Sequence, residues 1–147
     1  MDTISQDMRG QGIDGPLTWR GLLGWFIPTV LCPIAVLIGV VAPFRANGLQ
    51  HLDPGKVAGG TYDPKDLWPF TIDGFGDVLY LVGLLAVPAG LLLVVPLVAV
   101  PILLSRSWRR TTTGARVMGL ATVVLAASLI AFLLTPSGMV MGSWIAD

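Results

Sequence analysis

The sequence predicts an all-α integral membrane protein, a bundle of three transmembrane helices with a long external loop between helices 1 and 2. Two observations predict this fold class. Three apolar runs, residues 21–44, 78–104 and 117–135, contain no charged side chain and no histidine. Of the 147 residues, 54% are hydrophobic and 12% are charged, whereas an average soluble domain has about 25% charged residues. We therefore expect each run to form one membrane-spanning helix.

The run 78–104 is the longest and is expected to form the central helix, transmembrane helix 2. Its 27 residues exceed the roughly 20 that cross a hydrocarbon core about 30 Å thick, so the helix must tilt or bend. Three prolines predict bends, because each lacks an N–H group and clashes with the carbonyl group four residues earlier. They are Pro88, Pro96 and Pro101. Such prolines also occur at hinges of transporters, but proline is common in membrane helices generally, and we favour simple bending.

The remaining apolar runs and the two ends of the chain are assigned from their length and polarity in the same way. Residues 1–20 are polar and are expected to form a flexible cytoplasmic tail. Residues 21–44 are expected to form transmembrane helix 1, uncleaved, because 24 residues exceed the 7 to 15 of a signal-peptide core. Residues 117–135 have about the minimum length for transmembrane helix 3. Residues 136–147 are too few to cross, which predicts a short external interfacial tail.

Residues 45–77 form a polar connection of 33 residues in which neither a helical nor a strand period persists. Its Asp53-Pro54 and Asp63-Pro64 pairs are typical of turns. Asp77 directly precedes the second run and is expected to cap that helix. A connection this long without secondary structure usually serves as a lid, a binding loop or a contact with a partner.

Residues 105–116 are expected to form a basic cytoplasmic loop with four arginines and no acid, Arg106, Arg109, Arg110 and Arg116. Basic residues near helix ends face the cytoplasm, which predicts a cytoplasmic amino terminus, an external carboxyl terminus and a plasma-membrane location. These arginines also suit anionic lipid headgroups; topology alone explains them, and the two interpretations are compatible. The tryptophans near the proposed boundaries are expected to act as interfacial anchors. They are Trp19, Trp25, Trp108 and Trp144.

Small residues spaced by three or four positions mark faces on which membrane helices pack closely. Each apolar run has one such stripe. The stripes consist of Cys32, Ala35, Gly39 and Ala42; Gly83, Ala86 and Gly90; and Ala115, Gly119, Thr122 and Ala126. We expect them to join the helices into a bundle or to leave one face for another subunit, although a chain with 18 glycines also forms such stripes by chance.

The sequence offers little chemistry. It contains no HExxH, GxSxG or CxxC motif and no phosphate-binding glycine loop, and its apolar runs hold no ionisable residue for a proton relay. We expect no enzymatic activity, no cofactor, no metal site and no nucleic-acid partner. One alternative is a cation or ligand site in the loop 45–77, although Asp-rich loops are usually solvated turns. Its oxygen and nitrogen ligands would be His51, Asp53, Asp63 and Asp66.

These observations favour a small non-catalytic membrane protein that acts by association. Its partners would be the lipid bilayer and either another membrane protein, for which it is an accessory or structural subunit, or further copies of itself. The main alternative is a small oligomeric transport protein, a pore or carrier, whose path runs along the proline-bent second helix. The two hypotheses differ in whether the purified protein carries a partner or supports flux.

Overall fold

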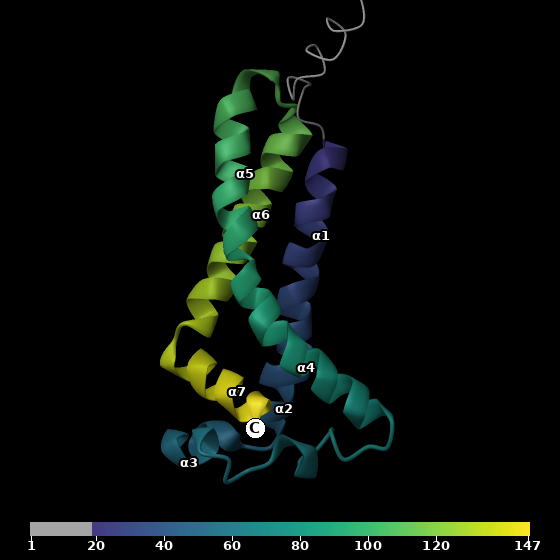
Figure 1. Ribbon diagram of the computed structural model, residues 1–147, viewed down its shortest axis with the longest axis vertical. Coiled ribbons are helices and arrows are strands. Elements are labelled where there is room, and N and C mark those ends of the chain that lie inside the picture. The colour runs from purple at the N-terminus through teal and green to yellow at the C-terminus, as the bar shows by residue number, and fades with distance from the viewer. Residues whose placement is uncertain (1–18) are drawn as a thin grey trace, which may run out of the picture.

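The computed structural model describes residues 19–147, so nearly all of the expected tail over residues 1–20 lies outside the described residues. The described residues form helices and turns and contain no β-strand (Figure 1). The α-helices are α1 (Trp19–Val36), α2 (Ala42–Ala46), α3 (Pro54–Ala58), α4 (Phe75–Leu92), α5 (Val94–Ser107), α6 (Thr113–Leu133) and α7 (Pro136–Ala146). Between them lie a π-helical turn, η2 (Leu37–Val41), and the 3-10 turns η3 (Leu49–His51), η4 (Pro64–Asp66) and η5 (Trp108–Arg110).

Three helical stretches are long and apolar enough to cross a membrane. They are Trp19–Ala46, Phe75–Arg110 and Thr113–Leu133. In the most apolar window of each stretch only 28% of the residues are buried inside the chain, and many large apolar side chains of these helices are exposed. Soluble monomers rarely expose contiguous apolar patches larger than a few hundred Å². These helices suggest a multi-pass membrane protein.

The second apolar run forms two helices, α4 and α5, which meet at Leu93 and diverge in direction (Figure 1). Pro96 lies three residues beyond this break, and because it has no N–H group the carbonyl group of Leu92 lacks its usual helical donor. The N–H group of Leu93 donates to the carbonyl oxygen of Gly90 at 3.2 Å, which tightens the last turn of α4. The break therefore lies beside Pro96, whereas Pro88 and Pro101 stay inside α4 and α5.

The first long helix is interrupted by the π-helical turn η2, which the apolar pattern did not predict. The N–H group of Ala42 donates to the carbonyl oxygen of Leu37, five residues earlier. Pro43 follows and has no N–H group to offer the carbonyl group of Gly39, so a wider turn at this point is consistent with the proline. The turn η2 is in contact with α4, and Gly39 in this turn lies against Gly83 of α4.

The long helices pack into a bundle in which α6 contacts both α1 and α5, and α1 contacts α4. One apolar cluster joins three of these helices around the break in the second run. It comprises Cys32, Val36, Ala86, Leu93, Ala126, Leu129 and Leu133. Leu93, at the break itself, therefore packs together with side chains of α1, α4 and α6.

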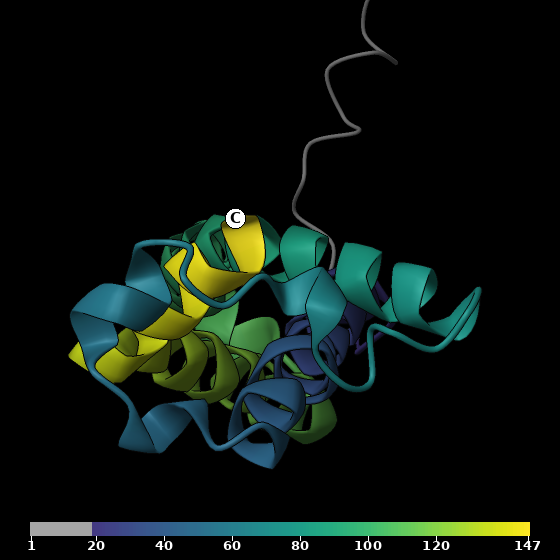
Figure 2. The same cartoon turned by 90° about the horizontal axis from the view of Figure 1, so that it is seen from below.

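Residues 47–74 and α7 fold together at one end of the bundle, a layer that we call the cap. Seen from below, α7 lies across the end of the helices and α3 lies beside it (Figure 2). The side chains of Asp53 and Asp63 accept hydrogen bonds of 2.9 Å from the N–H groups of Gly55 and Lys65, and so begin α3 and η4. The connection expected to lack secondary structure therefore contains short helical turns.

The start of α4 also differs from the sequence-based expectation. Gly74, with φ of +72°, precedes the first helical residue, Phe75. Asp77 lies in the first turn of α4 and does not cap it. In that position its carboxylate still favours the helix, because negative charge near a helix amino terminus is stabilising.

Candidate functional site

Trp144 lies at the centre of the cap and is fully buried. Its ring centroid lies 5.4 Å from that of Phe44 and 6.1 Å from that of Phe70. Its Nε1–H group donates to the carbonyl oxygen of Tyr62 at 2.9 Å. Trp144 was expected to be an interfacial anchor, and that expectation is wrong, because a side chain enclosed by its own chain contacts no headgroup.

The core around Trp144 is drawn from four separate parts of the sequence. It comprises Val40, Phe44, Leu49, Val57, Phe70, Leu79, Met141, Trp144 and Ile145. The residues Leu49, Val57 and Phe70 come from the connection between the first and second long helices, where they follow no period. Since Val40 and Leu79 belong to the long helices themselves, the cap and the bundle share one core.

A cavity of about 170 Å³ lies between the start of α7 and the turn η3. Its walls are largely apolar and include Phe44, Leu49, Val140 and Met141, with Gln50 and Ser137 as polar members. None of the described wall residues is ionisable. The cavity is therefore unsuited to acid–base chemistry.

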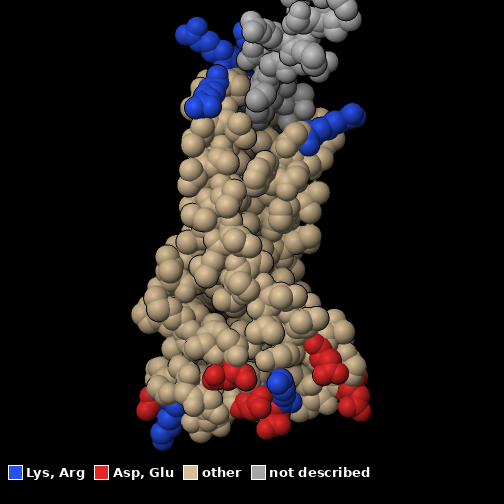
Figure 3. Space-filling view, in the orientation of Figure 1, with Lys and Arg blue, Asp and Glu red and all other residues tan. Residues whose placement is uncertain are grey.

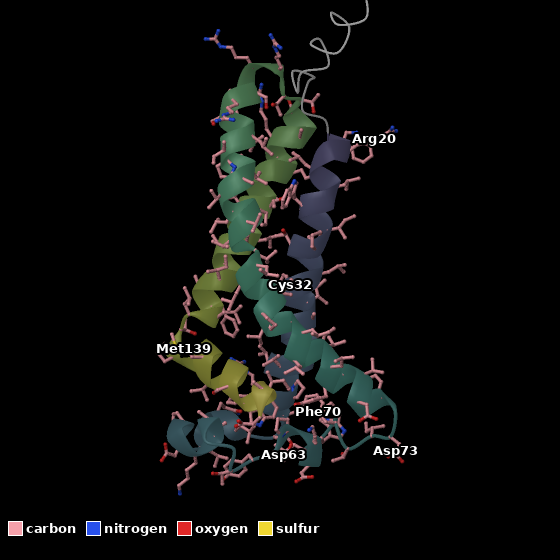
Figure 4. The ribbon with its side chains drawn as sticks, viewed as in Figure 1. Arg20, Cys32, Asp63, Phe70, Asp73 and Met139 are labelled. Atoms are coloured by element: carbon pink, nitrogen blue, oxygen red, sulfur yellow. The ribbon has the colours of Figure 1, made fainter. Side chains whose placement is uncertain are left out.

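The outer surface of the cap carries charges of both signs. Asp63 and Asp73 lie at this end of the molecule (Figure 4), and Lys56 and Lys65 are exposed on the same layer. The Nζ atom of Lys65 lies 5.2 Å from the ring centroid of Tyr80. The belt of long helices between the cap and the opposite end shows no charge on the visible face (Figure 3).

The opposite end of the bundle carries arginines. Arg106, Arg109 and Arg110 are exposed around the turn η5, and Arg20 lies at the same end on α1 (Figure 4). Arg116 is half-buried, and its Nη2 group donates to the carbonyl oxygen of Trp108 at 2.8 Å. The charged side chains of the described residues thus lie at the two ends of the molecule, with an uncharged belt of long helices between them.

The stripes of small residues lie at helix crossings inside the chain. A Cβ atom built on Gly39 would lie 2.8 Å from the Cα atom of Gly83, and one on Gly90 would lie 2.7 Å from Cδ1 of Leu133. Most residues of the three stripes are buried, whereas Ala35 is half-buried and Ala42 is exposed. The buried residues are Cys32, Gly39, Gly83, Ala86, Gly90, Ala115, Gly119, Thr122 and Ala126. Most residues of the three stripes therefore pack against neighbouring helices of the same chain.

The buried polar groups of the long helices bond to backbone carbonyl oxygens, within the same helix for the two threonines and across to α4 for Cys32. The hydroxyl groups of Thr29 and Thr122 donate to the carbonyl oxygens of Trp25 and Met118, at 2.6 and 2.9 Å. The Sγ atom of Cys32 donates weakly to the carbonyl oxygen of Ala86 at 3.5 Å. These groups form no continuous polar path along the described part of the bundle.

The candidate cation ligands of the connecting segment are not brought together. Among the described residues there is no group of three or more His, Cys, Asp or Glu side chains arranged to hold a metal ion. Asp53 and Asp63 instead cap short helical turns. The alternative built on His51, Asp53, Asp63 and Asp66 has no geometric support.

No protein-family model, curated protein or solved structure matches this chain.

Proposed function

We propose that the protein is a non-catalytic, multi-pass membrane protein that acts by association, as an accessory or structural subunit of a membrane assembly or as a homo-oligomer. The observation that carries this proposal is the cap. A packed, charged layer sits on one end of an uncharged helical belt, and its core is continuous with the bundle through Val40 and Leu79. Such a layer offers a preformed surface to a partner outside the bilayer.

The small-residue stripes support the bundle and do not supply the partner surface. Gly39, Gly83 and Gly90 are already in close contact with neighbouring helices, so a second chain has no access to them. The exposed surface of the cap is a better place for a partner. It carries Lys56 and Asp66, both exposed, on segments held by the Asp53 and Asp63 caps.

We further propose that the arginine end is cytoplasmic and the cap external, in the plasma membrane. The distribution of basic residues supports this orientation, because arginines near the ends of membrane helices favour the cytoplasmic side. Arg20 and the arginines around η5 share one end, whereas the three basic residues of the opposite end are mixed with carboxylates.

The test is purification of the full chain from native membranes in a mild detergent, followed by measurement of its native mass. A co-purifying protein or a defined homo-oligomer is the expected result. The double variant Lys56→Gln and Asp66→Asn should weaken the association, whereas the matched pair Arg106→Gln and Arg109→Gln at the other end should not. A monodisperse monomer without partner would contradict the proposal.

A second candidate function, a small oligomeric pore or carrier, is favoured by the break at Leu93 beside Pro96. Against it, Leu93, Pro96 and Val100 are buried among apolar groups. This candidate predicts that Pro96→Ala changes flux in proteoliposomes. Absence of flux with the unmodified protein would remove it.

A further inference from the structure

The arginine end is assembled from separate parts of the chain. Arg20 belongs to α1, Arg106 to the last turn of α5, and Arg109 to η5. All three are exposed. Since α6 contacts both α1 and α5, the folding of the bundle gathers these guanidinium groups, which are far apart in the sequence, at one end of the apolar belt (Figure 3).

Two exposed tryptophans lie at this end of the bundle. Trp19 is 49% exposed and Trp108 is 45% exposed. The Cζ atom of Arg20 lies 5.5 Å from the ring centroid of Trp19, and that of Arg116 lies 4.6 Å from the ring centroid of Trp108. Exposed tryptophan rings favour the headgroup zone of a bilayer. In a bilayer that surrounds the uncharged belt, the guanidinium groups of Arg20 and Arg116 would therefore lie near the lipid phosphates.

No carboxylate is available to these arginines from the described elements that form this end. Residues 19–52 and 78–146 contain no Asp or Glu, and the described acids belong to residues 53–77 and to Asp147. The described acids are thus confined to the cap and its junction with α4, at the other end of the belt (Figure 3). The arginine end accordingly has a positive field that its own described acids do not balance.

We propose that the arginine end binds the headgroups of anionic lipids. This inference rests on the membrane location proposed above, but not on any protein partner. A guanidinium group donates parallel hydrogen bonds to phosphate oxygens, which makes arginine well suited to such headgroups. Arg20, Arg106 and Arg109 supply the exposed groups, while Trp108 holds Arg116 beside them. The surface selects for the charge of the headgroup.

The experiment measures lipid retention by the full-length protein in detergent micelles, where membrane orientation has no influence. Phosphatidylglycerol and phosphatidylcholine of the same acyl chains are added in equal amounts, and the bound lipid is counted by native mass spectrometry. We expect preferential retention of phosphatidylglycerol. Each basic residue near a charged lipid surface contributes about fivefold, so Arg106→Gln with Arg109→Gln should reduce retention by roughly twentyfold to thirtyfold.

Two control variants separate charge from structure. Lys56→Gln with Lys65→Gln removes the same number of charges at the cap and should leave retention unchanged. Arg106→Lys with Arg109→Lys keeps the charge and should restore most of the binding. Equal retention of the two lipids, or equal loss in the Lys56 and Lys65 variant, would overturn the proposal. Failure of the cap to bind a partner would leave this result unaffected, so the two proposals fail separately.

Discussion

Gly39 and Gly83 are in backbone contact where the π-helical turn of the first long helix crosses α4. A Cβ atom built on Gly83 would lie 2.6 Å from the carbonyl oxygen of Gly39 and 3.2 Å from Cγ1 of Ile145 in α7. The first long helix, α4 and the cap helix α7 therefore meet at this one crossing. Because the neighbouring atoms of Gly39 in η2 are backbone atoms, they cannot rotate away from an added side chain.

Gly83→Ala should for this reason destabilise the fold. Overpacking of a tight contact costs about 1 to 3 kcal/mol, and the loss should appear as a lower midpoint of thermal unfolding in detergent, followed by circular dichroism. The matched control is Gly24→Ala, because a Cβ atom at Gly24 meets nothing within 4 Å. Equal midpoints for the two variants would show that the crossing is not tight.

Replacement of Trp144 should release the cap from the bundle. Trp144→Ala removes two aromatic contacts and the hydrogen bond to Tyr62, and the loss of a buried tryptophan side chain costs about 3 to 5 kcal/mol. We expect faster tryptic cleavage after Lys56 and Lys65, measured by mass spectrometry of the fragments. Trp144→Phe keeps most of the packing and should have a smaller effect, since it loses a hydrogen bond worth about 1 kcal/mol.

Trp68→Ala is the control for that experiment, because Trp68 is 59% exposed. Its cleavage pattern should match that of the unmodified protein. If Trp144→Ala were cleaved no faster than Trp68→Ala, the cap would not depend on the buried ring.

Pro96→Ala should straighten the junction of α4 and α5. Alanine supplies the N–H group that the carbonyl group of Leu92 lacks, so a continuous helix becomes favourable. Spin labels at positions 78 and 105, both exposed, report the change as a longer distance, toward the roughly 40 Å of a straight helix with 27 steps of 1.5 Å. The labels require Cys32→Ala as background.

Pro101→Ala is the matched control for the junction. Pro101 lies inside α5, beyond the break, so its replacement should leave the distance between the labels unchanged. The same distance in the Pro96→Ala variant and in the unmodified protein would mean that packing of Leu93, and not the missing N–H group, sets the break.

The long helices could be predicted from the sequence because their signal is local. Each apolar run satisfies its own backbone hydrogen bonds as a helix, and the three runs over residues 21–44, 78–104 and 117–135 lie inside or largely inside the three apolar helical stretches of the structure. The position of the break in the second run was harder to predict from the sequence. Three prolines were equivalent by spacing, and the apolar pattern does not show which of them ends a helix. In the structure the break lies beside Pro96, where Leu93 packs with residues of α1 and α6.

The cap could not be predicted from periodicity. Its helical segments between the first two long helices have three to five residues, which is too short for a period to appear. Leu49, Val57 and Phe70 become core residues only because α7 returns from the far end of the chain. A local signal was present, since Asp53-Pro54 and Asp63-Pro64 have the capping residue and first-position proline of a helix start.

Trp144 shows the limit of assigning tryptophans by their distance from an apolar run. Its position after Thr113–Leu133 resembled that of an interfacial anchor, yet α7 turns it inward against Phe44. Trp19 and Trp108, in contrast, remain exposed. The burial of Trp144 depends on the path that the chain takes after the last long helix, and the amino-acid composition does not specify that path.

The most direct test of the central claim is the accessibility of single cysteines in sealed membrane vesicles of known orientation. In a Cys32→Ala background, Thr61→Cys places a thiol on the cap, Ser105→Cys at the arginine end and Leu85→Cys in the belt. We predict that a membrane-impermeant maleimide labels the first two from opposite sides and the third from neither. Labelling of the cap and the arginine end from the same side, or rapid labelling in the belt, would contradict a membrane-spanning bundle with the cap and the arginines on opposite faces.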